Sequence, residues 1–380
     1  AITNLNTSTN TQTFGVDVFG NTIIGNGDDS VLFNQTTNTI DFGSNVTIGS
    51  NVDQTVTVGS GGDYATLNLA LEHLSKIVPA YKSGGFTATI NILSNTIITE
   101  QIHVSGVDLS FIEITSTDSS VEVNTSNFTT IEGQLSFITI SDGGNSPVIS
   151  ALFTTNNNQL APVGLLVIGG GSFAKISSGA GLDSFGKSII ARDGGEIYGY
   201  GAILTNSKMV AIELNDGIAK LGNSDISGLK RGFEVYQGSY LYLYSATANG
   251  LERVGFISNS TAQISYTDFS GWSDTNNSSI LFISNSDVFA NRTNFSGSTN
   301  AFNKKIDITQ SDVKFDLADF GWGSGTEQEI LIEGSVLSIQ NSSRFKAQMS
   351  KGSTVRAAQS TGYSSNVTPQ TLTVNGLLFE

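Results

Sequence analysis

The sequence predicts an all-β protein built as a right-handed parallel β-helix, a solenoid in which short strands stack coil upon coil. Three observations predict this fold class: a composition suited to strands and turns, a repeat of roughly 22 residues, and alternation of apolar and polar residues within each repeat. The chain has 380 residues, with 42 glycines and 4 prolines. Hydrophobic residues make up 38% and charged residues 13%, so we expect a packed core rather than a disordered chain.

The repeat begins at about residue 165 and consists of two alternating strands separated by a small turn, as in GFEVYQGSYLYLY. Because one coil cannot bury its own apolar side, we expect coils about 4.8 Å apart to stack into one apolar column. The chain lacks the frame of leucine-rich repeats and the period of about 40 residues of propeller blades. The apolar residues that open the second strand of successive copies are Ala174, Ile197, Ala219, Leu241, Ala262, Val288, Val313, Leu337 and Val355.

The chain is predicted to divide into three parts. Residues 1–57 are Gly-punctuated segments without the coil period, and we interpret them as an N-terminal stalk or collar. Residues 58–355 form the β-helix, which begins with an amphipathic helix at about 64–78 that covers the first coil, with Asp63 as its N-cap. Residues 356–380 close the solenoid. The expected apolar face of the helix consists of Leu67, Leu71, Leu74 and Val78.

Charge and composition disfavour several classes of partner. The net charge of -15 argues against nucleic acid and anionic membranes, and no apolar run is long enough for membrane insertion. There is no cysteine, and no calcium-binding DxDxDG loop occurs. His73 and His103 have no nucleophile or metal partner at a recognisable spacing, and we interpret both as structural. We therefore predict no metal and no cofactor.

The order of these segments resembles bacteriophage tailspike and tail-fibre proteins with a pectate-lyase-like right-handed parallel β-helix. The resemblance rests on the stretch VTVGSGGDYATLNLAL, the β-helix after it and the tail TLTVNGLLFE, and it covers about residues 56–380. It implies a homotrimer on a virion tail, outside the cell, joined to the tail or baseplate through an N-terminal segment. It also implies binding, and often cleavage, of a bacterial surface polysaccharide. No catalytic signature of the family is present, so candidate residues come from the repeat alone.

The repeat places a row of tyrosines on the outer surface. In QGSYLYLYSATANG (237–250), leucines alternate with tyrosines, which predicts a strand with buried leucines and outward tyrosines. Aromatic faces stack on the apolar faces of sugar rings, and charged groups hold hydroxyls or carboxylates. The predicted substrate-binding residues are Tyr198, Tyr200, Lys220, Tyr240, Tyr242 and Tyr244.

The predicted catalytic residues are Arg192, Glu213 and Glu234, which follow one another at intervals of 21 residues. If all three point outward in adjacent coils, the two carboxyl groups lie about 5 Å apart, as in a retaining glycosidase. Repulsion between them would raise the pKa of one carboxyl so that it could serve as a general acid, with the other as base or nucleophile and Arg192 as an orienting cation. Endo-glycosidic hydrolysis is therefore the first prediction. Nearby alternative carboxylates are Asp193, Glu196, Asp216 and Asp225.

Other interpretations of the same residues remain open. A lyase acting on a uronate-containing glycan would need a base and a cation, for which Lys220, Arg192 and Tyr198 or Tyr242 are candidates. A non-catalytic fibre would use the same surface only to bind its receptor. The glutamates and arginine could instead be an ordinary charge ladder, and the tyrosines could pack between subunits of a trimer. Trp272 and Trp322, at equivalent corners of their coils, are expected to cap turns or contact a neighbouring subunit rather than stack on sugar.

Overall fold

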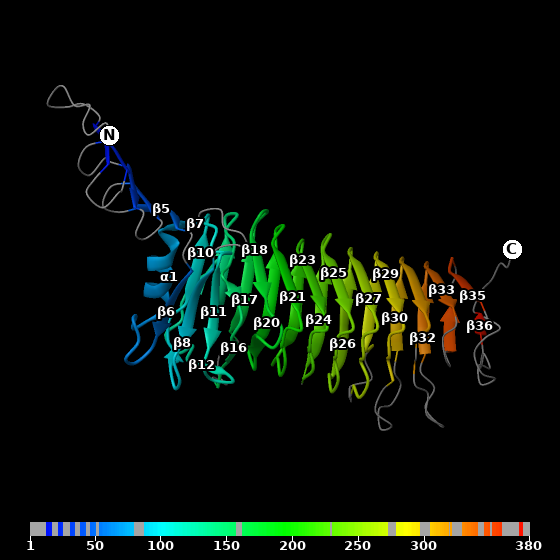
Figure 1. The fold of residues 1–380 in the computed structure, drawn as a ribbon. Coiled ribbons are helices and arrows are strands. Elements are labelled where there is room, and N and C mark those ends of the chain that lie inside the picture. Colours follow the sequence, from blue (N-terminus) through cyan, green and yellow to red (C-terminus); the bar gives the residue numbers. More distant parts are fainter. Residues whose placement is uncertain are drawn as a thin grey trace.

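In the part of the chain that the structure describes, the molecule is a long parallel β-helix with one α-helix and a small, mostly antiparallel sheet at its N-terminal end (Figure 1). This all-β parallel solenoid confirms the predicted fold class. The computed structural model describes residues 13–16, 22–25, 31–34, 39–42, 46–50, 53–79, 87–156, 162–228, 230–272, 279–296, 305–318, 320, 329–340, 346–349, 352–358 and 372–374.

Two long parallel sheets run the length of the solenoid. Sheet I, in spatial order, consists of β10 (Ile102–Ser105), β14 (Gln134–Ser141), β17 (Val163–Ile168), β20 (Lys187–Arg192), β22 (Val210–Asn215), β24 (Arg231–Tyr236), β26 (Arg253–Ser258), β28 (Leu281–Ser284), β30 (Lys305–Thr309), β32 (Glu329–Glu333), β34 (Lys346–Met349) and β36 (Leu372–Val374). The short strand β13 (Thr130–Ile131) pairs with β14 in antiparallel fashion.

Sheet II consists of β6 (Gln54–Val58), β8 (Ala88–Ile92), β11 (Ile112–Ser116), β15 (Val148–Ile149), β18 (Phe173–Ile176), β21 (Glu196–Tyr200), β23 (Ile218–Gly222), β25 (Tyr240–Tyr244), β27 (Thr261–Ser265), β29 (Asp287–Asn291), β31 (Asp312–Asp316), β33 (Val336–Gln340) and β35 (Thr354–Ala358). A third, shorter sheet holds β9 (Ile97–Ile98), β12 (Val121–Val123), β16 (Leu152–Thr154) and β19 (Gly181–Asp183). Each coil thus contributes one strand to sheet I and the next to sheet II.

The predicted repeat alignment is confirmed by the register of sheet II. All nine apolar residues that anchored the copies, from Ala174 to Val355, are successive Cα partners in neighbouring strands. Those from Ala174 to Leu337 whose burial is described are almost fully buried. The inward row is therefore the apolar column that the repeat predicted. The residues next to each of its members along the strand point outward.

The corners between sheet I and sheet II explain the recurring Asn-Ser and Gln-Ser turns. Several corners turn through a residue with φ between 46° and 55°, a conformation that Asn and Asp tolerate better than most side chains. Where a serine follows, as at Asn285 and Gln310, it is buried and accepts a backbone N–H from the coil before it: Ser286 accepts from Ser260 at 3.2 Å and Ser311 from Ser286 at 3.1 Å. A ladder of serines thereby joins successive corners. The corner residues with this φ include Asp193, Asp216, Gln237, Asn259, Asn285 and Gln310.

Large aromatic side chains fill the interior of the solenoid. Phe269 and Phe295 stack with ring centroids 5.5 Å apart, and Phe295 stacks on Phe320 at 5.7 Å. Trp272 is fully buried, and its indole N–H donates to the carbonyl oxygen of Phe295 at 2.9 Å. Trp272 is therefore structural, as expected, whereas Trp322 lies outside the described residues.

The helix α1 (Leu67–Ser75) covers the first coil but is shorter than the predicted 64–78. Its N-cap is Thr66, whose hydroxyl accepts the Leu69 N–H at 3.3 Å, and the prediction of Asp63 was wrong. The Asp63 carboxylate instead accepts the backbone N–H and the hydroxyl of Thr57, each at 2.8 Å. Among the described residues, no helix is long and apolar enough to cross a membrane.

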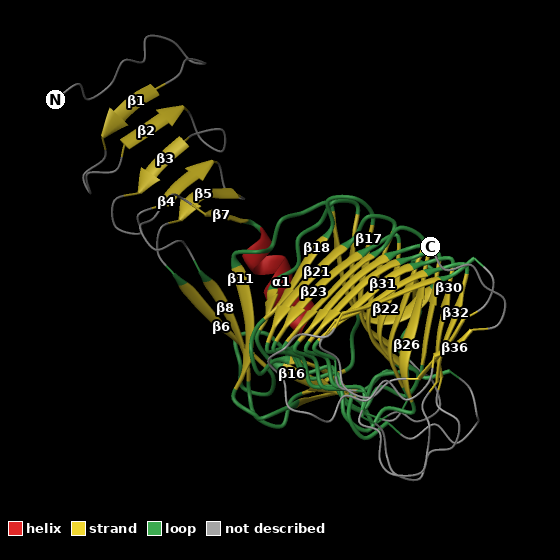
Figure 2. Ribbon diagram, turned by 90° about the vertical axis from the view of Figure 1, so that its right-hand side faces the viewer, coloured by secondary structure: helices red, strands yellow, loops and turns green. Residues whose placement is uncertain are grey.

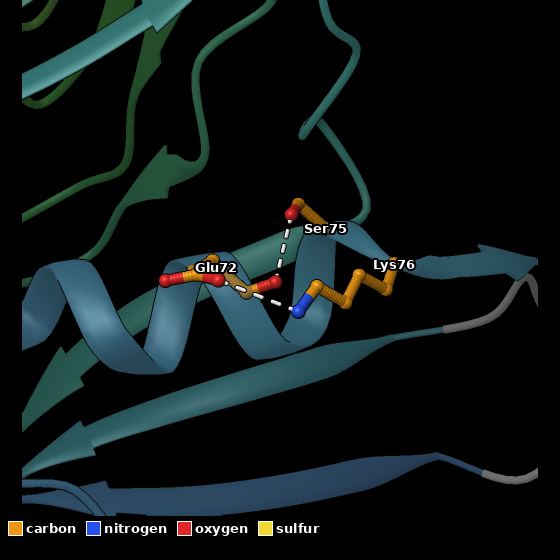
Figure 3. Close-up of polar contacts among 3 residues, drawn as sticks. All are labelled: Glu72, Ser75 and Lys76. Carbon is orange, nitrogen blue, oxygen red and sulfur yellow. Dashed lines mark hydrogen bonds and ion pairs between the residues drawn. The ribbon is translucent and has the colours of Figure 1, made fainter. Parts of the chain in front are cut away.

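One face of α1 packs on the core and the opposite face is wet. Leu67, Ala70, Leu71 and Leu74 are buried against β6 and β8. On the exposed side, Lys76 and Glu72 form an i,i+4 ion pair at 3.3 Å, and the Ser75 hydroxyl donates to the Glu72 carbonyl (Figure 3). The expected fourth apolar position, Val78, lies in β7 (Ile77–Pro79), because the chain leaves the helix there to pair with the antiparallel sheet.

The small N-terminal sheet stands apart from the solenoid (Figure 2). It contains β1 (Thr13–Val16), β2 (Thr22–Gly25), β3 (Val31–Asn34), β4 (Thr39–Phe42) and β5 (Val46–Ser50), with β7 on its last edge. Strands β1 to β5 are antiparallel neighbours in sequence order, a meander unlike the coils. The next strand, β6, already pairs with β8 in sheet II, so the solenoid begins before residue 58.

Candidate functional site

The predicted tyrosines line the outer face of sheet II. We call Tyr198, Tyr200, Tyr240, Tyr242 and Tyr244 the tyrosine strip. They alternate with buried Ile197, Leu241 and Leu243, so the strand period that hides the aliphatic side chains brings all five phenol rings to one face. Tyr200 is 63% exposed and Tyr244 is 40% exposed. The outward orientation inferred from QGSYLYLYSATANG is correct.

A groove of about 370 Å³ opens at the β18–β21–β23 end of the strip. Lys175, Tyr198 and Lys220 are successive Cα partners, so one tyrosine lies between two lysines along the row. Both lysine side chains are exposed. The lining residues are Lys175, Ile176, Ser177, Ser178, Tyr198, Gly199, Tyr200 and Lys220, and none of them is acidic.

The Tyr198 hydroxyl is the middle of a hydrogen-bonded chain in this groove. The Lys220 ammonium donates to it at 2.8 Å and also lies 4.7 Å from the centre of the Tyr198 ring. The Tyr198 hydroxyl in turn donates to Oε2 of Glu196 at 3.0 Å. The hydrogen bond to Tyr198 is the largest cause that raises the pKa of Lys220 above its usual value, so its amine remains an ammonium ion. The edge of Phe173 packs on Tyr198 at 4.9 Å between ring centroids.

The remainder of the strip continues as a surface of aromatic rings. Tyr242 and Tyr244 are nearly parallel, with an interplanar angle of 4° and centroids 6.3 Å apart. Tyr244 contacts Tyr266, on whose ring the Arg292 guanidinium lies at 5.3 Å. Tyr266 is 43% exposed and was missed from the sequence, because it occupies a corner with φ of 55° rather than a strand position.

A second groove, of about 410 Å³, lies further along the same face over β25, β27, β29 and β31. Its walls carry Tyr240 of the strip together with Gln263 and Phe289. Asp287 and Asp312, which are Cα partners, add two carboxylates. The outer face of sheet II is therefore basic and aromatic at one groove and acidic at the next.

The predicted catalytic carboxylates lie on sheet I, and the direct pairing expected for them is correct. We call Glu213 and Glu234 the glutamate pair, since they are Cα partners on β22 and β24 and both point outward. Each has its own cation: Lys187 contacts Glu213 at 2.6 Å, and Arg231 is ion-paired with Glu234. Repulsion between the two carboxylates is thus offset by one positive charge each.

Tyr236, which the sequence did not single out, lies beside the glutamate pair. Burial of its phenol, and then the negative charge of Glu234, raise the pKa of Tyr236 to about 12. Its ring contacts Phe256 at 5.2 Å, and Phe256 stacks on Phe282 at 4.7 Å. The row that holds the glutamate pair therefore turns apolar in the next coils, where Phe256 and Phe282 follow Glu234.

The expected position of Arg192 was wrong. Its Cα partner in β22 is Asn215, whereas the partner of Glu213 is Ile190, so Arg192 lies two residues beyond the glutamate row. The reason is that coils differ in length, and a constant interval of 21 residues does not keep register. Arg192 donates to the carbonyl oxygen of Glu132, in the turn between β13 and β14, and contacts Asp193 at 3.8 Å.

The glutamate pair and the tyrosine strip do not form one site, contrary to the expectation of a single strip. They lie on sheet I and sheet II, which a sharp corner at Asp216 separates. Outward side chains of two sheets that meet at a corner diverge. Among the described residues, no hydrogen bond, ion pair or ring contact joins the two sets, and the Lys220 ammonium interacts with Glu196, not with the glutamate pair.

The remaining candidate residues have local partners. The Asp225 carboxylate accepts the Ser227 N–H at 2.9 Å, which closes a turn. His103 hydrogen-bonds the Ser141 hydroxyl at 3.0 Å, and His73 packs on Tyr64 at 5.4 Å between ring centroids. Within the described ranges, no group of three or more His, Cys, Asp or Glu side chains is arranged to hold a metal ion.

Comparison with known proteins gives little similarity in sequence. No protein-family model matches the chain, and no curated protein matches it. Two crystal structures of the pectin methylesterase from Aspergillus niger, in penultimately deglycosylated and in deglycosylated form, each show 14% identity over 87% of this chain and 92% of that one. Their TM-scores are 0.16 and 0.15, values too low to support an inference about the activity of this chain.

Proposed function

We propose that this protein binds a bacterial surface polysaccharide along the outer face of sheet II, as a phage tailspike or tail-fibre protein. The observation that carries the proposal is the tyrosine strip, which presents five phenol rings on one face beside a groove with two exposed lysines. Exposed tyrosines in such a row supply large apolar area with a hydrogen-bonding hydroxyl at the tip.

An extended glycan suits this surface better than a compact ligand does. Neighbouring strands are about 4.8 Å apart, a spacing comparable to that of successive sugars in a chain, so ring after ring can meet a new coil. Both grooves lie along the same sheet and open to solvent on the outer face. Capsule, O-antigen and exopolysaccharide are the classes of polymer that have this extended, repetitive form.

The setting we propose is a homotrimer on the virion tail, outside the cell, attached through its N-terminal segment. The family resemblance over about residues 56–380 supports it, as does an antiparallel sheet of separate topology at the N-terminal end of the solenoid (Figure 1). Light scattering tests the oligomeric state, and a monomer mass would contradict the trimer.

Truncation of the most exposed tyrosines tests the binding surface. Tyr200→Ala and Tyr244→Ala should each weaken binding to the host polysaccharide by about 3- to 10-fold, since an aromatic contact contributes about 0.5–1.5 kcal/mol. Leu69→Ala is the matched control, because Leu69 is 48% exposed on α1, at the N-terminal end of the solenoid and outside the tyrosine strip. Unchanged affinity in both tyrosine variants, measured by surface plasmon resonance on immobilised polysaccharide, would overturn the proposal.

A second candidate function is hydrolysis of the polysaccharide at the glutamate pair. The favouring observation is the direct register of Glu213 with Glu234, since the strand spacing of about 4.8 Å is close to the carboxyl separation of retaining glycosidases. Glu213→Gln or Glu234→Gln should then abolish shortening of the polymer, followed by size-exclusion chromatography. Retained cleavage in both variants would remove the glutamate pair as the catalytic residues.

A further inference from the structure

We infer that the outer face of sheet I is covered by the same face of a second copy of this chain, with Tyr236, Phe256 and Phe282 at the centre of the contact. The inferred contact rests on the self-association in the proposed function, and it adds which face of the solenoid turns toward the neighbouring copy. It leaves the tyrosine strip and both grooves of sheet II on the outside of the assembly, where a polymer can reach them.

The centre of this face is a contiguous patch of aromatic rings. Phe256 and Phe282 are Cα partners on β26 and β28 with ring centroids 4.7 Å apart, and the ring of Tyr236 lies 5.2 Å from that of Phe256. All three point outward and are partly exposed in the single chain. Single exposed apolar side chains are ordinary on a protein surface, whereas contiguous apolar patches mark sites of contact. Because an aromatic side chain can bury about 150–250 Å², three of them suit the core of an interface.

The row that holds these phenylalanines is already a packing surface in the coils before it. It runs through successive Cα partners on sheet I: Leu166, Ile190, Glu213, Glu234, Phe256 and Phe282. Leu166 is 0% exposed and Ile190 2%, although both lie on the outer face and form an apolar cluster with Val163 that is separate from the main core. The chain itself therefore covers the row at Leu166 and Ile190, but it leaves Phe256 and Phe282 open to a second molecule.

The charges on this face are balanced, which favours contact with a copy of itself. Lys187 is paired with Glu213 and Arg231 with Glu234, so each pair has no net charge. The whole chain carries a net charge of -15, so two copies repel one another over most of their surfaces and least where the local charge is zero. The side chains of Lys187 and Glu213 are each 20% exposed and that of Glu234 is 14% exposed. Little of their solvation is therefore left to lose on contact.

The tyrosine strip is the other aromatic surface, and its charges make it less suitable for self-association. Lys175 and Lys220 flank Tyr198 in the row on sheet II, and both ammonium groups are exposed. Burial of an ammonium ion against an identical face, which presents further ammonium ions, is unfavourable. Lys220 also lies over the Tyr198 ring, whereas in the described part of sheet I no cation lies over Phe256 or Phe282.

The face is large enough for a stable interface. In the described part of the chain, the path of sheet I runs through twelve strands. At about 4.8 Å per strand and about 3.3 Å per residue, strands of about five residues make a face of about 55 Å by about 16 Å, or about 900 Å². A stable interface takes about 800 Å² from each partner. Contact along this face closes the glutamate pair to a polymer and therefore excludes hydrolysis there.

Single cysteines test the contact directly, because the chain contains no cysteine. Ser258 and Ser284 are Cα partners next to the aromatic patch, and replacement of serine by cysteine hardly changes the size of the side chain. Ser338→Cys, on the outer face of sheet II and also partly exposed, is the matched control. After treatment with a short bismaleimide, we expect covalently linked chains on a denaturing gel from Ser258→Cys and Ser284→Cys, and unlinked chains from Ser338→Cys.

A charge placed in the patch tests whether the aromatic rings hold the copies together. Phe256→Glu should weaken self-association by at least about 30-fold, since a few central aromatic residues dominate the affinity of an interface. Tyr244→Glu makes the same exchange on sheet II and should leave self-association unchanged. Light scattering over a dilution series measures both, and circular dichroism checks that both variants fold. Equal association of Phe256→Glu and the unsubstituted protein would overturn the inferred contact, and if Phe256→Glu did not fold, the cysteine variants would still decide.

The outcomes separate this contact from the proposed function. Linked chains from Ser338→Cys but not from Ser258→Cys would place the contact on sheet II and overturn it on sheet I. An oligomer that is linked through none of the three cysteines would also overturn it, while the homotrimer would stand. A monomer mass would contradict both the contact and the homotrimer. Polysaccharide binding is judged separately, from Tyr200→Ala and Tyr244→Ala.

Discussion

The outer faces of sheet I and sheet II differ although the same coils build them. On sheet I, the glutamate pair is neutralised by Lys187 and Arg231, and aromatic rings follow in the next coils. On sheet II, lysines and tyrosines of the same coils leave a groove with exposed ammonium and phenol groups. Regular stacking therefore does not by itself make a site. A row of side chains whose charges pair with one another stabilises the solenoid. A row whose charges face a groove can bind a ligand.

The largest effect is expected in sheet II, where a substitution on the buried face of one strand is compared with a substitution on its outer face. Leu243→Ala removes a fully buried side chain and should lower the free energy of unfolding by about 2–5 kcal/mol. Its neighbour Tyr244 points outward and, among the described aromatic residues, contacts only the rings of Tyr242 and Tyr266, so Tyr244→Ala should lower this free energy by about 0.5–1.5 kcal/mol. Urea denaturation measures both. Equal losses would mean that the tyrosine face is itself packed.

A smaller effect is expected for the charges on sheet I. Lys187 and Glu213 are each 20% exposed, so Lys187→Met should cost about 1–3 kcal/mol through the carboxylate left without its cation. In a double-mutant cycle with Glu213→Gln, the coupling free energy should be about 1 kcal/mol or more.

The control for that cycle is an ion pair of the same length on the surface. Lys230 and Glu252 are also 2.6 Å apart but are 48% and 45% exposed, and water screens them. Their coupling should be about 0–1 kcal/mol. If the two cycles gave equal coupling, the charges on sheet I would contribute no more to stability than ordinary surface charges, and their use in catalysis would gain support.

The last expected effect is a dependence of stability on alkaline pH, at Tyr236 beside the glutamate pair. Burial and the charge of Glu234 raise the pKa of Tyr236 to about 12, above the ordinary value of about 10 in the unfolded chain. The folded state therefore holds this proton more tightly. The associated stability is fully present below about pH 10 and is lost as the pH rises toward 12. The difference in unfolding free energy between the protein and Tyr236→Phe should change over this range, and a constant difference would show that Tyr236 titrates normally.

The fold and the row of each outward side chain on sheet II could be predicted from the sequence. Alternation in YLYLY and in its neighbouring copies fixes which residues are buried, and the burial of Ala219, Leu241 and Ala262 keeps successive copies in register. The prediction was wrong where it relied on a constant interval. Arg192 lies two residues from Glu213 in register because the coils between them differ in length.

Helix capping shows a second limit of the sequence. Asp63 and Thr66 are both good N-cap residue types, and the sequence pattern does not rank them. The structure decides between them because Asp63 is held by Thr57 of β6, a strand whose position depends on the solenoid. The same dependence affects the end of α1, where Ile77–Pro79 pairs with β5 instead of continuing the helix.

By itself, the sequence determined the parallel β-helix, the buried column and the outward direction of the tyrosines, because a strand period of two and a repeated coil leave one way to bury the apolar residues. Only the tertiary structure decided which outward residues share a site. The corner at Asp216 turns the glutamate pair away from the tyrosine strip, and the register of β18, β21 and β23 places Tyr198 between two lysines. These relations depend on contacts between coils, which a local pattern does not contain.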